Sequence, residues 1–361
     1  MSYLSRPIET PADPALGELA ELLAGLADGL DTSGNWPAQQ LDWCAQYGVF
    51  SWFAPRAWGG REWSEEDIIR GYLALSAACL TTTFVITQRT GACQRIERSG
   101  NEEIKRRLLP DLIQGKFFAT VGISHLTTSR RHLSQPVLRA TETGSGFVLD
   151  GYSPWVTGGG QARYVVLGAT LADGREILVT VPTDSPGVKA SPPQPLVGLS
   201  ASHTGAVVCH QVPVPREWVL AGPIQDVIKQ GWGARTGGLQ TSTLALGLAE
   251  SAIRFLETES QRRPEIGHPA LALRDEGEEL KTALLHAARQ QPVCTDAELR
   301  TRANSLVLRA TQSALGAAKG SGYVAGHPVG RWCREALFFL VWSCPQPVLN
   351  ANLCEFAGIE G

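Results

Sequence analysis

The pattern of apolar residues changes twice along the 361 residues, from helical to strand-like and back to helical. Residues 1–118 carry apolar side chains at helical spacing, and residues 119–221 carry short apolar runs broken by prolines. Residues 222–361 return to long helical patterns. A doubly wound nucleotide-binding fold would alternate strands with helices, so this order excludes that class. The sequence predicts an α+β fold of three domains with these boundaries.

Local signals predict several element boundaries. Ser64 to Asp67 resembles a capping box with Asp in the usual Glu position, and Thr295 to Glu298 forms a complete one before a helix that ends near Gly320. In the middle region, Asp173-Gly174 lies between two apolar runs and predicts a β-hairpin. Asp150-Gly151 predicts a further turn.

Composition excludes several classes of partner. The net charge of -3 and the isoelectric point near 6.2 give no basic field for nucleic acid. The longest apolar run, residues 336–342, is far shorter than the ~20 residues of a membrane-spanning helix. Eight cysteines contain no CxxC pair, so no metal site is predicted, and a reducing cytoplasm is the expected location. No GxGxxG follows a strand, which argues against a Rossmann cofactor site.

Several motifs between about Cys44 and Pro345 are similar to those of one large flavoenzyme family. Trp155 to Gly159 (WVTGG) resembles that family's WITNG, and Gly198 to Thr204 (GLSASHT) resembles its GLRGSDT. The run from Gly320 to Ala336 resembles its GGxGY…PVxRxxRDA signature. On these motifs the chain resembles the acyl-CoA dehydrogenase family. The resemblance implies an N-terminal helical domain, a middle β-barrel or sandwich and a C-terminal four-helix bundle.

The resemblance also implies FAD as cofactor and a set of residues that bind it. Ser124 matches a hydroxyl that hydrogen-bonds the flavin, Trp155 a side chain that packs on the isoalloxazine, and Thr157 a donor near its reactive nitrogen. Arg263 matches the arginine that binds the FAD pyrophosphate, usually of a neighbouring subunit, and a guanidinium suits that role. Gly320 allows close backbone approach to the dinucleotide. A homodimer or homotetramer is therefore expected.

The catalytic carboxylate that the family uses to remove an α-proton is missing at both of its usual places. Counting from Arg334 to the first place leads to Ser343, and the second place falls at Gly237 and Gly238. A serine is no base without a partner. His125, beside the flavin-facing Ser124, is the one titratable candidate for a base, and its alternative role is that of a hydrogen-bonded structural histidine.

The expected function is that of an FAD-dependent oxidoreductase that oxidises an acyl-CoA or related small molecule by hydride transfer to flavin, without the standard base. Two alternatives stay open. One is a flavin-dependent monooxygenase on the same fold, and the other is a catalytically silent subunit that binds flavin or an acyl group.

Overall fold

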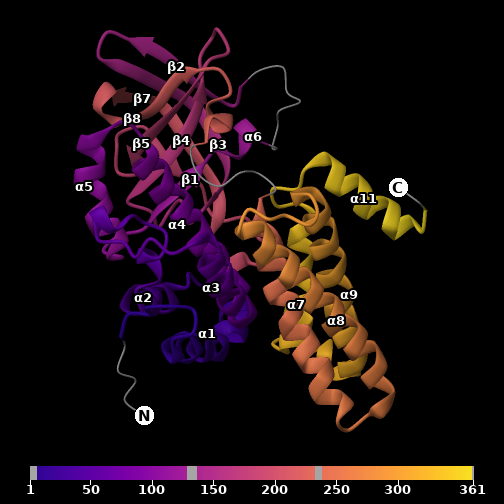
Figure 1. The fold of residues 1–361 in the computed structure, drawn as a ribbon. Coiled ribbons are helices and arrows are strands. Elements are labelled where there is room, and N and C mark those ends of the chain that lie inside the picture. The colour runs from indigo at the N-terminus through magenta and orange to yellow at the C-terminus, as the bar shows by residue number, and fades with distance from the viewer. Residues whose placement is uncertain (1–5, 128–135, 232–237, 360–361) are drawn as a thin grey trace.

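The computed structural model describes residues 6–127, 136–231 and 238–359 and divides into a helical, a strand-rich and a second helical region (Figure 1). The first region holds two 3-10 turns, η1 (Val49–Ser51) and η2 (Arg56–Trp58), between its second and third helices. Its five α-helices are α1 (Pro14–Ser33), α2 (Ala38–Gln46), α3 (Glu65–Ala78), α4 (Leu80–Arg98) and α5 (Glu102–Ile113). Ser64 caps α3 by accepting from the Asp67 amide, as its sequence predicts.

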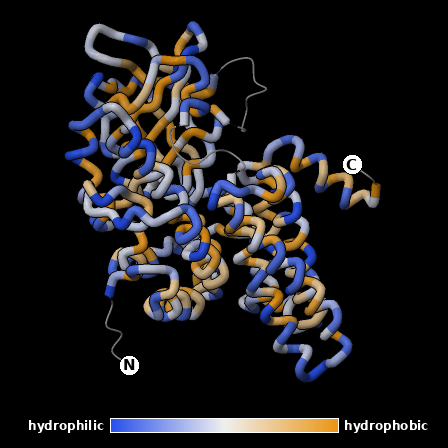
Figure 2. The backbone as a smooth tube through the Cα atoms, viewed as in Figure 1, coloured by the Kyte–Doolittle hydropathy of each residue, from blue (hydrophilic) through white to orange (hydrophobic). Residues whose placement is uncertain are grey.

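The middle region is a sheet in the order β6-β7-β3-β2-β4-β5-β8, with β1 paired in parallel to β4. Short helices α6 (Ser124–Thr127), η3 (Ser200–Ser202), η4 (Arg216–Trp218) and η5 (Val227–Gln230) lie in its connections. The strands are β1 (Ala119–Gly122), β2 (Leu138–Thr143), β3 (Gly146–Thr157), β4 (Tyr164–Thr170), β5 (Glu176–Pro182), β6 (Val188–Ala190), β7 (Thr204–Pro215) and β8 (Val219–Ile224). Figure 2 shows its hydrophobic residues concentrated along the strands.

The hairpin predicted at Asp173-Gly174 is confirmed, because β4 and β5 pair antiparallel across it. The turn predicted at Asp150-Gly151 is wrong. Both residues lie inside β3, where Gly151 has a φ of +124° and an added Cβ would meet the Val137 carbonyl oxygen at 2.1 Å. At Gly151 the backbone of a neighbouring strand comes close, and the β3–β7 register shifts. A glycine inside a strand can allow such a close approach, just as a glycine in a loop can allow a turn.

The third region is a bundle in which α7 (Leu239–Ser260) packs against α8 (Gly267–Ala288), α9 (Asp296–Gly322) and α10 (Pro328–Ala336). The capping box at Thr295 and Glu298 opens α9 as predicted. The 3-10 segments η6 (Pro264–Ile266) and η7 (Leu337–Leu340) precede α8 and follow α10. The last helix, α11 (Gln346–Ala357), leaves the bundle and projects to one side (Figure 1). The α+β fold class predicted from the sequence is confirmed.

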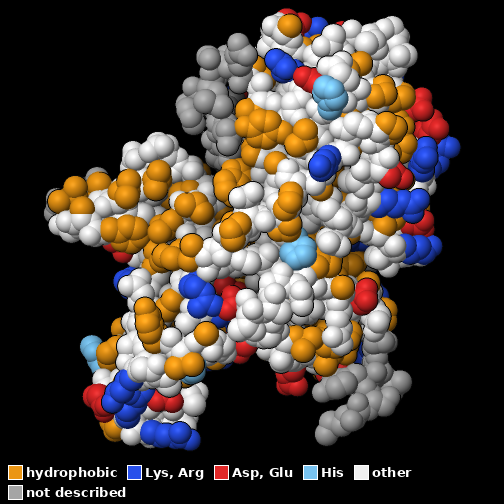
Figure 3. All heavy atoms as spheres, turned by 180° about the vertical axis from the view of Figure 1, so that it is seen from behind, with side chains coloured by type: hydrophobic (Ala, Val, Ile, Leu, Met, Phe, Trp, Pro, Cys, Tyr) orange, Lys and Arg blue, Asp and Glu red, His pale blue; other side chains and the backbone are white. Residues whose placement is uncertain are grey.

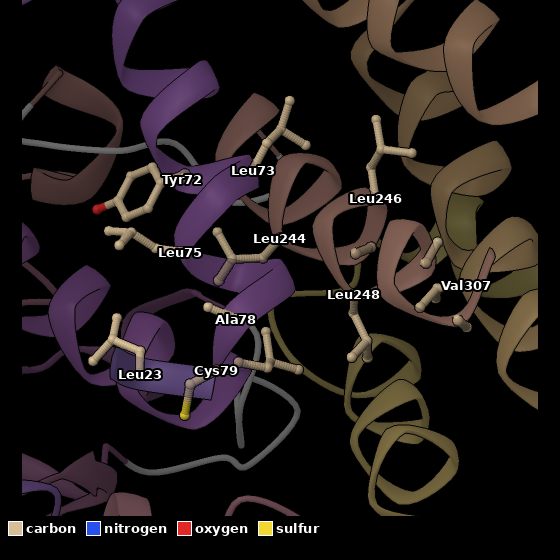
Figure 4. Packing of buried hydrophobic residues seen from close by; sticks show 14 of the residues in the cluster. Leu23, Tyr72, Leu73, Leu75, Ala78, Cys79, Leu244, Leu246, Leu248 and Val307 are labelled. Atoms are coloured by element: carbon tan, nitrogen blue, oxygen red, sulfur yellow. The ribbon is translucent and has the colours of Figure 1, made fainter. Parts of the chain in front are cut away.

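The main hydrophobic core is shared between the two helical regions rather than closed within either. Figure 4 shows Leu73 and Leu75 of α3 in one hydrophobic cluster with Leu244 and Leu246 of α7. The helices approach so closely that an added Cβ on Gly247 would lie 2.8 Å from the Leu73 carbonyl oxygen. This shared core fixes α7 against α3.

The domain limits at residues 118 and 221 stay a prediction.

Candidate functional site

A cavity of about 480 Å³ lies where α4, β1, β3, the start of α7 and the segment after η7 meet. Ser124, Trp155 and Thr157, three of the predicted flavin-contacting residues, all line it, and so does Ser343. Larger hollows of about 870 and 750 Å³ lie elsewhere, but none of these four residues lines them. The full lining consists of Phe84, Thr87, Gln88, Gly91, Arg95, Val121, Ile123, Ser124, Thr127, Trp155, Thr157, Thr204, Gln240, Thr241, Val341, Trp342 and Ser343.

Trp155 is held in an unusual conformation at the cavity wall. Its φ is +56°, in the left-handed region, at a shift of register between β3 and β7. The side chain is 52% exposed, although indole is among the largest apolar groups a protein can bury. Non-glycine residues in this region carry strain that is often found at functional sites. The irregular pairing of β3 therefore presents an aromatic face to the cavity.

Two hydroxyl groups stand beside this aromatic face. The Ser124 hydroxyl donates to the Pro154 carbonyl at 2.9 Å, which fixes it next to Trp155. The Thr157 hydroxyl lies 2.9 Å from the Thr204 hydroxyl, and Thr204 lies 2.8 Å from the Ser202 hydroxyl. These hydrogen bonds fix the positions of Ser124 and Thr157 in the cavity wall.

Ser343 reaches the cavity from the other side, in the segment that follows η7. Its φ is +48°, so it too has a left-handed backbone. The segment is anchored by Arg300, a buried side chain whose Nη2 donates to the Phe339 carbonyl at 2.8 Å and to the Trp342 carbonyl at 3.0 Å. Phe339 also accepts from the Asn304 amide at 3.2 Å. The position expected to hold a carboxylate is thus a well-fixed part of the cavity wall.

The cavity wall carries no Asp, Glu or His among the residues described. Two internal stretches, 128–135 and 232–237, lie outside the described residues; they include His132 and Gly237 but contain no Asp or Glu. Gly238, the other residue expected at the second base position, precedes α7 as its N-terminal cap. Neither usual base position supplies an acid.

His125 is adjacent to Ser124 in sequence but does not line the cavity. Its side chain is buried, with Nε2 2.8 Å from the Gly168 carbonyl oxygen and Nδ1 3.5 Å from the Ser153 hydroxyl. Burial lowers the pKa of the imidazole, with partial compensation from the Gly168 carbonyl. This placement favours the hydrogen-bonded structural role over that of a base.

Arg263 and Gly320 form a second group, away from the cavity. Nη2 of Arg263 donates to the Ala317 carbonyl at 2.6 Å and pairs with Glu259, so the arginine lies beside the end of α9 that carries Gly320. The cavity touches α7 at Gln240 and Thr241, near its first residue, whereas Arg263 follows its last. A helix of 22 residues spans about 33 Å. The predicted cofactor residues of one chain therefore lie at two distant places.

Sequence reasoning did not identify Arg95, Gln88 or Gln240 as residues of the cavity. Arg95 lies inside a largely buried helix, where an arginine is rare unless it is paired. That mismatch between residue type and helix pattern is the signal that could have found it. Within the described part of the chain, no cluster of three metal-binding side chains occurs, and none of the helices is long and apolar enough to span a bilayer.

Known proteins with related sequences point to one family. Residues 17–116 match the family model "Acyl-CoA dehydrogenase, N-terminal domain". The chain is 25% identical to the probable acyl-CoA dehydrogenase YngJ of Bacillus subtilis, over 87% of this chain and 88% of that protein. It is 24% identical to 3-sulfinopropanoyl-CoA desulfinase of Advenella mimigardefordensis, over 94% of this chain and 90% of that protein.

Solved structures show the same fold. Butyryl-CoA dehydrogenase from Megasphaera elsdenii superposes with a TM-score of 0.80 at 19% identity, covering 99% of both chains. A glutaryl-CoA dehydrogenase from Mycobacterium smegmatis in complex with FADH2 gives a TM-score of 0.79 at 18% identity, covering 96% of both chains.

Proposed function

The chain belongs to the acyl-CoA dehydrogenase family, and we propose that it is an FAD-dependent oxidoreductase that acts on an acyl-CoA or a related thioester. The observation that carries this proposal is the convergence of Ser124, Trp155 and Thr157 on one cavity. Ser124 begins α6, whereas Trp155 and Thr157 lie two residues apart on β3, and all three line the cavity as the family resemblance expects of flavin contacts. The relative solved with FADH2 supports the choice of cofactor.

The residues present fit a flavin. The exposed and conformationally strained Trp155 offers an aromatic face to a planar ring, and the hydroxyls of Ser124 and Thr157 stand ready to hydrogen-bond its edge. Bound FAD would supply a two-electron acceptor for a hydride. The chain's own side chains would orient the ring, exclude water from one face and line the remaining space for the substrate.

The described residues that line this cavity include no carboxylate to take a proton from the substrate. Ser343, at the usual base position, has an unactivated hydroxyl and serves as a hydrogen-bond donor or acceptor. The substrate proposed here is therefore one whose oxidation needs no strong enzymatic base at that position, because a neighbouring group of the substrate or solvent accepts the proton.

The absence of a carboxylate from the described cavity wall also favours a second candidate function, namely flavin chemistry other than dehydrogenation. A flavin-dependent monooxygenase or a catalytically silent flavin- or acyl-binding subunit would need no α-proton acceptor. A relative of similar identity is called a desulfinase rather than a dehydrogenase, so names within the family already extend beyond dehydrogenation.

We propose further that FAD joins two subunits in a homodimer or homotetramer. Because Arg263 and Gly320 are remote from the cavity within one chain, they would contact the FAD of a neighbouring chain. The projecting α11 supports assembly: Figure 3 shows hydrophobic side chains gathered on this arm, and Leu353, Phe356 and Ile359 are more than half exposed. Exposed apolar patches of this kind mark protein contacts.

A cytoplasmic location stays a prediction.

The experiment that tests the proposed function is an absorbance spectrum of the purified protein, followed by anaerobic titration with acyl-CoA thioesters. The proposal expects a flavin spectrum that bleaches with at least one thioester. A flavin that no thioester bleaches, combined with oxygen consumption in the presence of an external flavin reductase, would favour the monooxygenase. A protein that binds no flavin would contradict the proposal.

A further inference from the structure

Arg95 is a buried cation in the cavity wall, and one of its donors is unused. It lies in the last two turns of α4, and its side chain is only 4% exposed. Its Nη1 donates to the Gly91 carbonyl at 2.8 Å, while Nε has no hydrogen-bond partner in the described structure. Arg95 is also the one charged residue among the described residues that line the cavity.

No described carboxylate compensates the charge of Arg95. Burial, reinforced by repulsion from Arg98, lowers the pKa of its guanidinium to about 10, so it stays protonated near neutral pH. Arg331 is comparably buried but pairs with Asp28 at 2.8 Å and with Glu335 at 3.1 Å. Taking an unpaired cation out of water is strongly unfavourable. An arginine that is buried without a carboxylate partner beside a ligand cavity indicates that the ligand itself carries an anionic group.

The neighbouring residues make room for this side chain. A Cβ added to Gly91 would lie 3.2 Å from Nη1 of Arg95 and 3.5 Å from the Val121 side chain, so any larger residue would crowd the guanidinium. Gln88, Gly91 and Arg95 follow one another at helical spacing and all line the cavity. One face of α4 is therefore polar where it meets the cavity, in a helix that is otherwise largely buried.

We propose that Arg95 binds an anionic substituent, a carboxylate or a sulfur oxyanion, on the acyl portion of the substrate. The guanidinium supplies a charge-assisted hydrogen bond from a nitrogen other than the Nη1 that Gly91 engages, and two oxygens of such an anion match its fork. This inference rests on the proposed function, because it names the class of acyl thioester that the cavity accepts.

The test compares binding of matched thioesters to the FAD-loaded protein by isothermal titration calorimetry. The probes are dicarboxylic acyl-CoA thioesters of three to six acyl carbons and, for each, the neutral thioester in which isopropyl replaces the carboxylate. The wild type is expected to bind the best charged probe at least about 10-fold more tightly than its neutral partner. Arg95→Met removes this preference, and Arg95→Lys retains part of it.

Arg89→Met is the matched control. Arg89 lies on the same helix, is equally buried and also has an unpartnered nitrogen, but it stacks over the Phe50 ring, 3.7 Å from its centroid, and does not line the cavity. This variant is expected to keep the preference for the charged probes. A wild type without preference, or a preference that survives Arg95→Met, overturns the assignment while leaving the proposed function intact.

Two further measurements separate the possible causes of failure. FAD content and the flavin spectrum are compared in wild type and Arg95→Met, because loss of FAD in the variant would assign Arg95 to the cofactor and overturn the proposal. Thermal unfolding is followed with free glutarate and with glutaramide. If no thioester binds but glutarate alone stabilises the wild type and not Arg95→Met, the anion site stands and the proposed function fails. If glutarate has no effect either, both fail.

Discussion

Trp155 and Ser343 come from different regions of the chain, yet both face the same cavity and both have a left-handed backbone. Such conformations persist only where the surrounding structure holds them. For Trp155 that support is the irregular β3–β7 pairing, and for Ser343 it is the anchoring of the preceding residues by Arg300. At the residue scale, the site is a set of strained positions fixed by well-packed neighbours.

Replacing Trp155 with alanine is expected to weaken FAD binding roughly 10-fold, because aromatic stacking contributes about 1 kcal/mol beyond the apolar area it buries. The measurement is the dissociation constant of FAD from fluorescence titration of the apoprotein. Trp218→Ala is the control, since Trp218 stacks on Tyr164 at 5.8 Å and does not line the cavity. Equal FAD affinity in wild type and Trp155→Ala would remove Trp155 from the site.

Motif resemblance located Ser124, Trp155 and Thr157 because each stands in a short recognisable pattern. Arg95 could not be found in that way, since its role depends on its surroundings in space: it lines a cavity, and no carboxylate among the described residues pairs with it. His125 shows the reverse case. It is adjacent to Ser124 in sequence, but its side chain contacts the Gly168 carbonyl and does not line the cavity, so its role as a base stays a prediction and the structural role is favoured.

At the element scale, α3 and α8 are joined by one acidic residue with two arginine partners. Glu66 on α3 pairs with Arg289, which follows α8, through contacts of 2.6 and 2.7 Å, and with Arg70 at 2.8 Å. Hydrogen bonds from Arg289 and then Arg70 lower the pKa of the Glu66 carboxyl from 4.5 to about 2. The two helices are thus tied at the surface as well as through the shared core.

This pairing predicts a pH dependence of stability. A carboxyl with a lowered pKa stabilises the folded state above its unfolded pKa, and that contribution is lost as the pH falls from about 4.5 toward about 2. Solvent screening limits it to on the order of 1 kcal/mol. Glu66→Gln should therefore unfold at a lower temperature than wild type at pH 6, and the difference should shrink at pH 2.5. Glu21→Gln, at an exposed site in the interior of α1, is the control and should change neither value.

The elements themselves were largely predictable, and the exceptions have physical causes. Thr295 and Glu298 signal the start of α9 because a capping box satisfies free amides locally. Asp150-Gly151 misled because a glycine that admits a neighbouring backbone looks, in sequence, like a glycine that makes a turn. The difference lies in the contact with Val137, which only the folded sheet brings into place.

At the scale of the whole molecule, the predicted FAD contacts divide between two ends of α7. The account therefore predicts an oligomer in which Arg263 of each chain binds the FAD held by its neighbour. Arg263→Ala should weaken FAD binding by about 10-fold to 100-fold without changing the oligomeric state, since hydrogen bonds from charged groups contribute about 1.5–3 kcal/mol.

Arg262→Ala is the control for this prediction, because Arg262 is the adjacent arginine and is exposed. FAD content per chain and light scattering during gel filtration give the two readouts. A monomer that retains FAD fully, or an Arg263→Ala variant that keeps wild-type affinity, would contradict the bridged arrangement.

We propose that this cavity holds a flavin, although none of the described residues in its wall is the carboxylate that takes the substrate proton in the family. The rate of anaerobic flavin bleaching by saturated acyl-CoA thioesters in wild type and in Ser343→Glu tests this combination. We expect slow bleaching in wild type and a rate at least about 100-fold higher in the variant, because a positioned general base contributes about that much or more. Bleaching in wild type that is as fast as in Ser343→Glu would show that the chain already supplies a base, and would contradict the account.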